Sequence, residues 1–308
     1  MSEVRFDGHV VVVTGSGRGM GRSHALELAA RGARVVVNDV GRTDTSTSTA
    51  EVVAGEIADR GLTALARVDD IATPAGCEEL VAAAVVEYGR IDAIIHNAGI
   101  AQTVPIAEMT DELIETMLRV HLFAAVHLTR AAWPHFVRQQ GGRVLYISSA
   151  AGLYGVAGFT HYGPAKTALL SLARVVALEG AEQGIRANVL AVAAMTPMME
   201  EILADQPEQA SWWRAHRRPE QTTPAAVWLV HPSCSATNGR AYQARGGRVA
   251  RIVIAENPGY FNPELTVEDV RDHFDEVEDM SEWVAPDSSA ELNDIEREWF
   301  AARLPSLG

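Results

Sequence analysis

The chain has 308 residues, of which 47% are hydrophobic and 21% are charged, a composition typical of a globular protein. Its formal net charge of −14 argues against a nucleic-acid partner, because phosphates require a basic protein surface. The charge is uneven: the segment from Glu256 onward holds 15 acidic and 3 basic residues, a net charge of −12 that leaves −2 for the first 255 residues.

Hydropathy and cysteine content exclude further classes of protein. No apolar run reaches the roughly 18 to 20 residues that a membrane helix needs, so we expect no membrane partner. The chain starts without a basic region before an apolar stretch, and its end, residues 305–308, lacks a peroxisomal tripeptide, so we expect a cytoplasmic location. Cys77 and Cys234 have no partners at metal-ligand spacing, so we expect neither a disulfide framework nor a metal site.

From His9 to about Val192, short β-branched runs alternate with helical stretches. The expected strands are His9–Val13, Arg34–Asn38, Leu62–Val68, Ala93–His96, Arg143–Ile147 and Arg186–Val192. The expected helices are Gly21–Arg31, Ala50–Arg60, Pro74–Tyr88, Asp111–Gln139 and Tyr162–Glu182. Apolar strands that alternate with helices predict an α/β fold of the Rossmann type, a doubly wound parallel sheet with helices on both faces.

Two segments depart from this alternation. We expect one domain over residues 1–255, which includes a flap at 196–223, and an acidic C-terminal extension over 256–308. The flap mixes charged residues with methionines and tryptophans, which either cover an apolar substrate or simply pack. Its arginines either meet the phosphates of a coenzyme A group or form a solvated face; they are Arg214, Arg217 and Arg218. The extension offers Trp283 and Trp299 as docking anchors.

A glycine-rich loop connects the first expected strand to the first expected helix. It reads Thr14-Gly15-Ser16-Gly17-Arg18-Gly19-Met20-Gly21. Glycines in this position let the backbone turn tightly and approach a pyrophosphate, and the helix N-terminus presents N–H groups to the anion. An ordinary flexible turn is the alternative, but the position between a buried strand and a helix favours dinucleotide binding.

Asp39 stands at the end of the second expected strand, directly after Asn38 and about 20 residues past the loop. A carboxylate there can accept hydrogen bonds from both hydroxyls of an adenosine ribose, whereas it repels a 2′-phosphate. We therefore expect NAD rather than NADP as the cofactor, with Arg18 and Arg42 as the residues that could weaken this preference. The alternative for Asp39 is a turn residue with no role in binding.

Tyr162 and Lys166 lie four residues apart at the start of an expected helix, so both side chains project from one face. A phenol titrates near pH 10, and a nearby ammonium group and a cationic nicotinamide both favour its ionised form. Ser149 follows the fifth expected strand and could hold a substrate oxygen.

Four motifs in register resemble the short-chain dehydrogenase/reductase family over roughly residues 5 to 250. They are the loop at 14–21, Asn97-Ala98-Gly99 after the fourth strand, Ser149, and the pair Tyr162 and Lys166. The resemblance implies hydride transfer between a nicotinamide cofactor and a carbonyl or hydroxyl carbon. It assigns proton transfer to Tyr162, ribose binding to Lys166 and carbonyl polarisation to Ser149. It also places Asp70 and Ile71 along the adenine, and Asn97 and Gly99 in the cofactor cleft.

The chain departs from the family pattern at three places. Most relatives have an asparagine where this chain has His121, which either serves a proton relay or is an ordinary helix histidine. The usual Pro-Gly after strand six is replaced by Val192-Ala193, and Thr196 is the remaining candidate to bind the cofactor carboxamide. Pro164 lies inside the tyrosine motif, where the first turn of a helix tolerates it.

Within the family, the chain is most similar to hydroxyacyl-CoA dehydrogenase domains of multifunctional enzymes and to bacterial hydroxysteroid dehydrogenases. We therefore expect a small apolar substrate. The resemblance also implies a homo-oligomer, either a dimer or a tetramer, in which the helices over 111–139 and 162–182 form the contact between subunits. Two alternatives remain: a catalytically weak NAD-binding sensor, and a module whose acidic extension recruits a partner.

Overall fold

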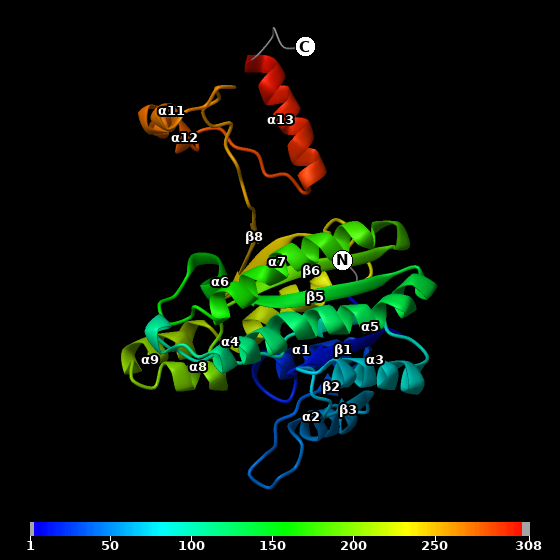
Figure 1. Cartoon of the computed structure of the whole chain (residues 1–308). Coiled ribbons are helices and arrows are strands. Elements are labelled where there is room, and N and C mark those ends of the chain that lie inside the picture. Colours follow the sequence, from blue (N-terminus) through cyan, green and yellow to red (C-terminus); the bar gives the residue numbers. More distant parts are fainter. Residues whose placement is uncertain (1–2, 304–308) are drawn as a thin grey trace. The chain divides into compact units, whose positions relative to one another are not determined.

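The computed structural model describes residues 3–303, which divide into two compact units at the bond between Arg251 and Ile252. The terminal residues 305–308 considered above lie outside the described part. The strands in chain order are β1 (Val10–Thr14), β2 (Arg34–Asn38), β3 (Ala64–Arg67), β4 (Ala93–His96), β5 (Gly142–Ser149), β6 (Ile185–Val192), β7 (Ala241–Arg245) and β8 (Arg248–Ile252). They form one sheet in the order β3-β2-β1-β4-β5-β6-β7-β8 (Figure 1).

The pairs from β3 through β7 are parallel, which confirms the predicted fold class. Strands β7 and β8 were not predicted. They are joined by Gly246 and Gly247, both with positive φ, as a tight hairpin turn requires. The helices of the first unit are α1 (Gly19–Ala30), α2 (Thr49–Ala58), α3 (Pro74–Tyr88), α4 (Asp111–Leu118), α5 (Ala124–Gln139), α6 (Ala150–Tyr154), α7 (Tyr162–Glu179), α8 (Pro197–Ile202), α9 (Pro207–His216) and α10 (Thr223–Leu229).

Two hydrophobic cores lie on opposite faces of the sheet, because successive residues of a strand point to opposite faces. In β1, Val11 and Val13 join the core that holds α1, α2 and α10. Val10 and Val12 join the core that holds α3, α5 and α7. All four valines are fully buried, which explains why the strand reads as a continuous apolar run.

The helix predicted over residues 111–139 is interrupted by a π-helical turn, Arg119–Phe123, between α4 and α5. A π turn adds one residue to a helical turn and is often found at functional sites. Its central residue, His121, is fully buried. The turn therefore directs an imidazole into the protein instead of along the helix surface.

The second unit contains α11 (Val267–Asp272), α12 (Phe274–Val277) and α13 (Ser289–Arg303). It has local order of its own: Thr266 and Asp269 form a capping box at the start of α11, and Tyr260 stacks on His273 at 3.9 Å between ring centroids. Of the two predicted docking anchors, Trp283 is 54% exposed and Trp299 is half-buried.

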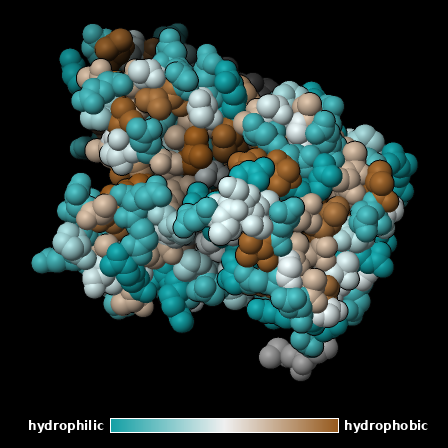
Figure 2. Space-filling model, turned by 90° about the horizontal axis from the view of Figure 1, so that it is seen from below, coloured by the Kyte–Doolittle hydropathy of each residue, from teal (hydrophilic) through white to brown (hydrophobic). Residues whose placement is uncertain are grey.

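No helix among residues 3–303 is long and apolar enough to cross a membrane. Figure 2 shows one face of the molecule, on which hydrophilic side chains surround scattered hydrophobic patches. Within the same described range there is no cluster of three or more metal-ligating side chains.

Candidate active site

A cavity of about 290 Å³ lies at the carboxyl ends of the strands, between the segments that follow β1 and β4. In the strand order β2-β1-β4, these are neighbours whose connections run in opposite directions. Such a switch point is where doubly wound sheets bind ligands. The predicted residues that line the cavity are Gly15, Arg18, Gly19, Met20, Asp39, Asp70, Ile71, Asn97, Ala98, Gly99, His121, Tyr162, Lys166 and Thr196. Gly17, Gly21 and Ser149 do not line it.

The glycine-rich loop leads into α1 with its N-terminus open to an anion. Arg18 is the N-cap and makes no side-chain cap hydrogen bond, and the first turn holds no acidic residue. The N–H groups of a helix N-terminus that lack such partners attract a pyrophosphate. Gly15 has φ +63°, and a Cβ there would lie 2.6 Å from the Cα of Ala98. The loop thus fits a dinucleotide and does not tolerate a larger residue at this position.

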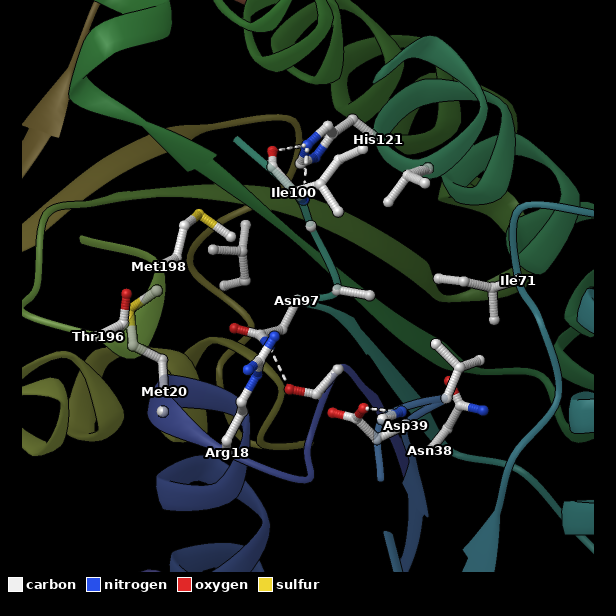
Figure 3. A pocket seen from close by; sticks show the side chains of 18 of the residues that line it. Arg18, Met20, Asn38, Asp39, Ile71, Asn97, Ile100, His121, Thr196 and Met198 are labelled. Carbon is white, nitrogen blue, oxygen red and sulfur yellow. Dashed lines mark hydrogen bonds between the residues drawn. The ribbon is translucent and has the colours of Figure 1, made fainter. Parts of the chain in front are cut away.

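Asp39 connects the glycine-rich loop to the end of β2. Its two carboxylate oxygens accept backbone N–H groups of Gly17 at 2.9 Å and Gly41 at 2.7 Å. Each oxygen keeps a second lone pair, and the side chain lines the cavity. The carboxylate is therefore held in place and still able to accept hydroxyl groups of a ligand (Figure 3).

The segment after β4 is fixed to the glycine-rich loop by hydrogen bonds. The Asn97 amide donates to the carbonyl oxygens of Thr14 and Gly15, each at 3.0 Å. In return, the Thr14 hydroxyl accepts the backbone N–H groups of Asn97 and Ala98, each at 3.1 Å. This reciprocal arrangement holds two walls of the cavity together.

Tyr162, Lys166 and Ser149 meet at the ends of β5 and α7. Lys166 donates from Nζ to the Ile147 carbonyl oxygen at 2.7 Å, and Nζ lies 5.7 Å from the centroid of the Tyr162 ring. Ser148 donates from Oγ to the Lys166 carbonyl oxygen at 2.8 Å, which fastens α7 to β5. Ser149 is the N-cap of α6, where its Oγ accepts the N–H of Ala151.

The electrostatics of these groups differ from the expectation that Lys166 acidifies the tyrosine. Burial raises the pKa of Tyr162, and a hydrogen bond with Ser149 opposes this shift. Burial also lowers the pKa of Lys166 to about 7, so the amine is only partly charged near neutral pH. Burial is therefore the largest influence on the pKa of both groups.

His121 lies against Tyr162, with ring centroids 5.3 Å apart and an interplanar angle of 87°. Its Nε2 is 2.8 Å from the Ile100 carbonyl oxygen and 3.2 Å from the Ile100 backbone nitrogen (Figure 3). Burial, followed by the charge on Lys166, keeps the pKa of His121 well below its ordinary value. The imidazole is therefore neutral near pH 7.

Thr196, Met198 and Met20 line one side of the cavity in Figure 3, opposite Asp39. Thr196 is the N-cap of α8, and its Oγ1 accepts the N–H of Met199 at 3.4 Å. Four apolar flap residues pack with Met195 in a small cluster; they are Met199, Leu203, Ala210 and Trp213.

Two of the three flap arginines have partners inside the flap. Arg214 forms an ion pair with Glu200. The guanidinium of Arg217 stacks on Trp213 at 4.1 Å and on Trp212 at 4.9 Å. Arg42, expected to affect cofactor choice, donates to the carbonyl oxygen of Ser46 and does not line the cavity.

The cavity is also lined by Val192, of the altered turn after strand six, and by Met198, one of the flap methionines. The sequence did not indicate the other lining residues, which are Asn38, Val40, Gly41, Ala72, Ile100, Val120, Ile147, Ser148 and Pro197. Most of these residues are adjacent in the sequence to a predicted site residue, and this adjacency is the only feature by which the sequence indicates them. Sequence reasoning also missed His96, whose Nε2 is 3.1 Å from the His121 carbonyl oxygen. No spacing rule connects residues 96 and 121, because the contact depends on the π turn.

Comparisons with known proteins agree with this geometry. Residues 9–207 match a family model described as short chain dehydrogenase. The chain is 39% identical over 277 residues to a short-chain type dehydrogenase/reductase of Mycobacterium tuberculosis, an alignment that covers 88% of this chain and 94% of the relative. It is 37% identical over 298 residues to peroxisomal multifunctional enzyme type 2 of Mus musculus, with 94% of this chain covered. This chain spans only 39% of that enzyme's length.

A solved structure extends the similarity. It is a 7α-hydroxysteroid dehydrogenase complexed with NADH and 7-oxo glycochenodeoxycholic acid. It superimposes with a TM-score of 0.73 at 28% sequence identity, and the match covers 80% of this chain and 98% of that one.

Proposed function

The chain belongs to the short-chain dehydrogenase/reductase family, whose members are NAD(P)-dependent oxidoreductases, and we propose that it uses NAD to interconvert a secondary alcohol and a ketone on an apolar substrate. The observation that carries this proposal is the meeting of Tyr162, Lys166 and Ser149 beside a cavity that begins at the glycine-rich loop. A protein that only sensed the cofactor would not need all three side chains.

In the proposed reaction, each of the three side chains has one task. During ketone reduction, the Tyr162 hydroxyl donates its proton to the substrate oxygen, and during alcohol oxidation the phenolate takes it back. Ser149 donates a hydrogen bond to that oxygen and polarises the carbonyl, and Lys166 holds the cofactor ribose. A bound nicotinamide would supply or accept the hydride, and its oxidised ring would place a positive charge near Tyr162.

NAD is the proposed cofactor because of Asp39. Its carboxylate lines the cavity and is fixed by two backbone N–H groups, so it cannot easily swing away from a ligand. A 2′-phosphate beside it would meet a like charge, whereas ribose hydroxyls would find an acceptor. Arg18 lines the same cavity and is the cation that could weaken this preference for NAD.

The substrate class follows from the walls of the cavity and from the relatives. Met198 and Ile100 contribute apolar surface, and the similar solved structure holds an oxidised bile acid. A hydroxysteroid and a 3-hydroxyacyl-CoA thioester both carry a secondary alcohol on an apolar body. The ion pair of Arg214 with Glu200 leaves less positive charge in the flap for coenzyme A phosphates, which favours the hydroxysteroid.

A substrate screen with a tyrosine variant tests the proposal. NADH formation is followed with a panel of hydroxysteroids and of 3-hydroxyacyl-CoA thioesters, and the best substrate is repeated with Tyr162→Phe. We expect kcat to fall by at least about 100-fold, the lower end of the range for lost acid–base catalysis. Tyr154→Phe is the matched control, because Tyr154 is 71% exposed. A Tyr162→Phe variant as active as the parent would exclude the proposed role.

We also propose a cellular location, an assembly and domain limits for the chain. A cytoplasmic homo-oligomer agrees with the sequence, although the mouse relative is named as peroxisomal. We also retain a catalytic domain over 1–255 and an acidic extension over 256–308. Fluorescence microscopy of the tagged chain and sedimentation of the purified protein test location and assembly.

A further inference from the structure

His96 is a buried histidine that lies outside the catalytic cavity. It is the last residue of β4, it is 1% exposed, and it does not line the cavity. Each ring nitrogen nevertheless has one polar contact. Nε2 lies 3.1 Å from the carbonyl oxygen of His121, and Nδ1 lies 3.4 Å from the hydroxyl oxygen of Thr14. The ring therefore connects the π turn to the end of β1.

The two contacts fix the protonation state of the His96 ring. A carbonyl oxygen can only accept, so Nε2 carries the proton and donates to His121. Burial, followed by the charge on Lys166, lowers the pKa of His96 to about 3, so the ring is neutral near pH 7 and Nδ1 carries no proton. Nδ1 therefore accepts the hydroxyl proton of Thr14. Only one of the two neutral tautomers fits this position.

The Thr14 hydroxyl extends these hydrogen bonds to the wall of the cofactor cavity. Its single proton goes to His96, and its two lone pairs accept the backbone N–H groups of Asn97 and Ala98, each at 3.1 Å. Asn97 and Ala98 line the cavity, as does Gly15, whose carbonyl oxygen accepts from the Asn97 amide. All hydrogen-bonding groups of the His96 ring and of the Thr14 hydroxyl are therefore in use.

At its other end, the network reaches the π turn that orients His121. The turn presents the His121 carbonyl oxygen to His96 and the ring of the same residue to Tyr162, with ring centroids 5.3 Å apart. A displacement of this carbonyl oxygen would move the ring with it, because both belong to one residue. The contact with His96 thus bears on the position of the group that packs against Tyr162.

We propose that His96 is a positioning residue that holds the glycine-rich loop in place for the cofactor and the π turn in place for Tyr162. The proposal rests on the proposed function and gives the two nitrogens of one ring separate tasks. Nδ1 holds the Thr14 hydroxyl and, through it, the wall of the cofactor cavity. Nε2 holds the His121 carbonyl oxygen and, through it, the ring beside Tyr162.

Two substitutions of His96 separate these tasks, because each keeps one of the two contacts. The short amide of asparagine places a polar atom near the position of Nδ1, and the longer amide of glutamine places one near the position of Nε2. His96→Asn therefore keeps an acceptor for Thr14 and loses the donor to the π turn. His96→Gln keeps the donor to the π turn and loses the acceptor for Thr14.

Turnover and cofactor binding give the first measurement. We expect His96→Asn to lower kcat about tenfold and to leave the Kd of NADH within about twofold of the parent, because one hydrogen bond to the π turn is lost. We expect His96→Gln to raise the Kd of NADH about tenfold and to change kcat by no more than about twofold. Fluorescence titration measures Kd, and kcat is measured at saturating cofactor. Two variants that change both quantities alike, or change neither, would overturn the proposal.

His24 provides the matched control. It is also fully buried, and its Nδ1 lies 2.9 Å from the hydroxyl oxygen of Thr223, but it does not line the cavity. We expect His24→Asn and His24→Gln to lower the free energy of unfolding without separating kcat from the Kd of NADH. The same separation in the His24 variants would contradict the proposal, because the loss of any buried histidine would then produce it.

Hydrogen exchange of the full chain tests the proposal without turnover. In His96→Asn we expect faster exchange of the backbone amides of Arg119–Phe123, and in His96→Gln faster exchange within residues 14–21 and 97–99. Exchange that rises equally in both regions in both variants would refute the proposal. A parent protein that turns over no substrate would instead refute the proposed function, and the exchange result would still decide the role of His96.

Nitrogen-15 NMR of the parent protein decides the matter if neither variant folds. The proposal requires a single His96 tautomer, with the proton on Nε2, at neutral pH. A ring with the proton on Nδ1, or one that exchanges between the two tautomers, would overturn it.

Discussion

Lys166 has an ionisable side chain that is almost completely buried. Its burial affects the stability of the fold as well as the chemistry of the site. Its pKa is lowered from 10.5 to about 7, so the folded protein favours the neutral amine more than the unfolded chain does. Between pH 7 and 10.5 the unfolded chain therefore binds more protons, and stability must rise with pH.

We predict that the free energy of unfolding without ligand increases by about 2 kcal/mol from pH 7 to pH 9, a gain absent in Lys166→Met. Urea titrations at the two pH values measure it. The measurement stops at pH 9 because burial raises the pKa of Cys77 to about 12. At higher pH the unfolded chain loses the thiol proton more readily than the folded protein, which lowers the free energy of unfolding. An equal pH dependence in parent and variant would contradict the assignment.

Asp39 should decide between the two cofactors through its charge. We predict that Asp39→Asn reduces the ratio of kcat/KM for NADH over NADPH by at least about tenfold, because the like charge opposite a 2′-phosphate is removed. Both values should also fall, since an amide nitrogen cannot accept from Gly17 or Gly41. Asp44→Asn, in the exposed loop after β2, is the control. A parent that prefers NADPH would reject the prediction.

Individual site residues could be predicted where chemistry requires a fixed spacing. Tyr162 and Lys166 lie one helical turn apart, and Asp39 directly follows β2, whose register with β1 places it beside the glycine-rich loop. His96 carries no such signal. It ends β4, and only the packing of β1 and the π turn around it shows that both of its ring nitrogens are used.

Elements could be predicted where burial makes the pattern simple. β2, β4 and α3 have the expected bounds, because strands buried on both faces are continuous apolar runs and α3 starts at a proline and ends at a left-handed Gly89. β7 and β8 were missed because both lie towards the edge of the sheet and mix arginine with apolar residues. The π turn was missed because hydrophobic periodicity does not resolve one added residue.

The π turn and the segment after β4 depend on each other through Gly99. A Cβ at position 99 would lie 2.5 Å from Cε1 of His121, whose ring is fully buried and held by Ile100. We predict that Gly99→Ala lowers the free energy of unfolding by about 1–3 kcal/mol through overpacking. Urea titration measures it. Gly55→Ala on α2 is the matched control, because nothing lies near its Cβ and alanine favours a helix. A Gly99→Ala variant as stable as this control would show that the ring moves freely.

At the scale of the whole molecule, stability in mild acid should be set by buried histidines and not by net charge. Burial is the largest cause that lowers the pKa of His24 to about 4, of His96 to about 3 and of His121 well below its ordinary value. Below pH 6.5 the unfolded chain takes up these protons and the folded protein does not, so the free energy of unfolding decreases as the pH is lowered. The net charge acts in the opposite direction, because it approaches zero near the isoelectric point of 5.1 and self-repulsion weakens.

We predict that the free energy of unfolding falls from pH 7 to pH 5, by about 2 kcal/mol for each of His24 and His96, and that His121 adds to this fall. Urea titrations at fixed protein concentration measure the slope. His24→Gln should remove about 2 kcal/mol of this fall. It should leave the catalytic cavity unchanged, because His24 does not line it and bonds Thr223 through Nδ1 at 2.9 Å. Since weakened self-repulsion alone would raise stability on acidification, a protein that becomes more stable towards pH 5 would show that these imidazoles accept protons without unfolding.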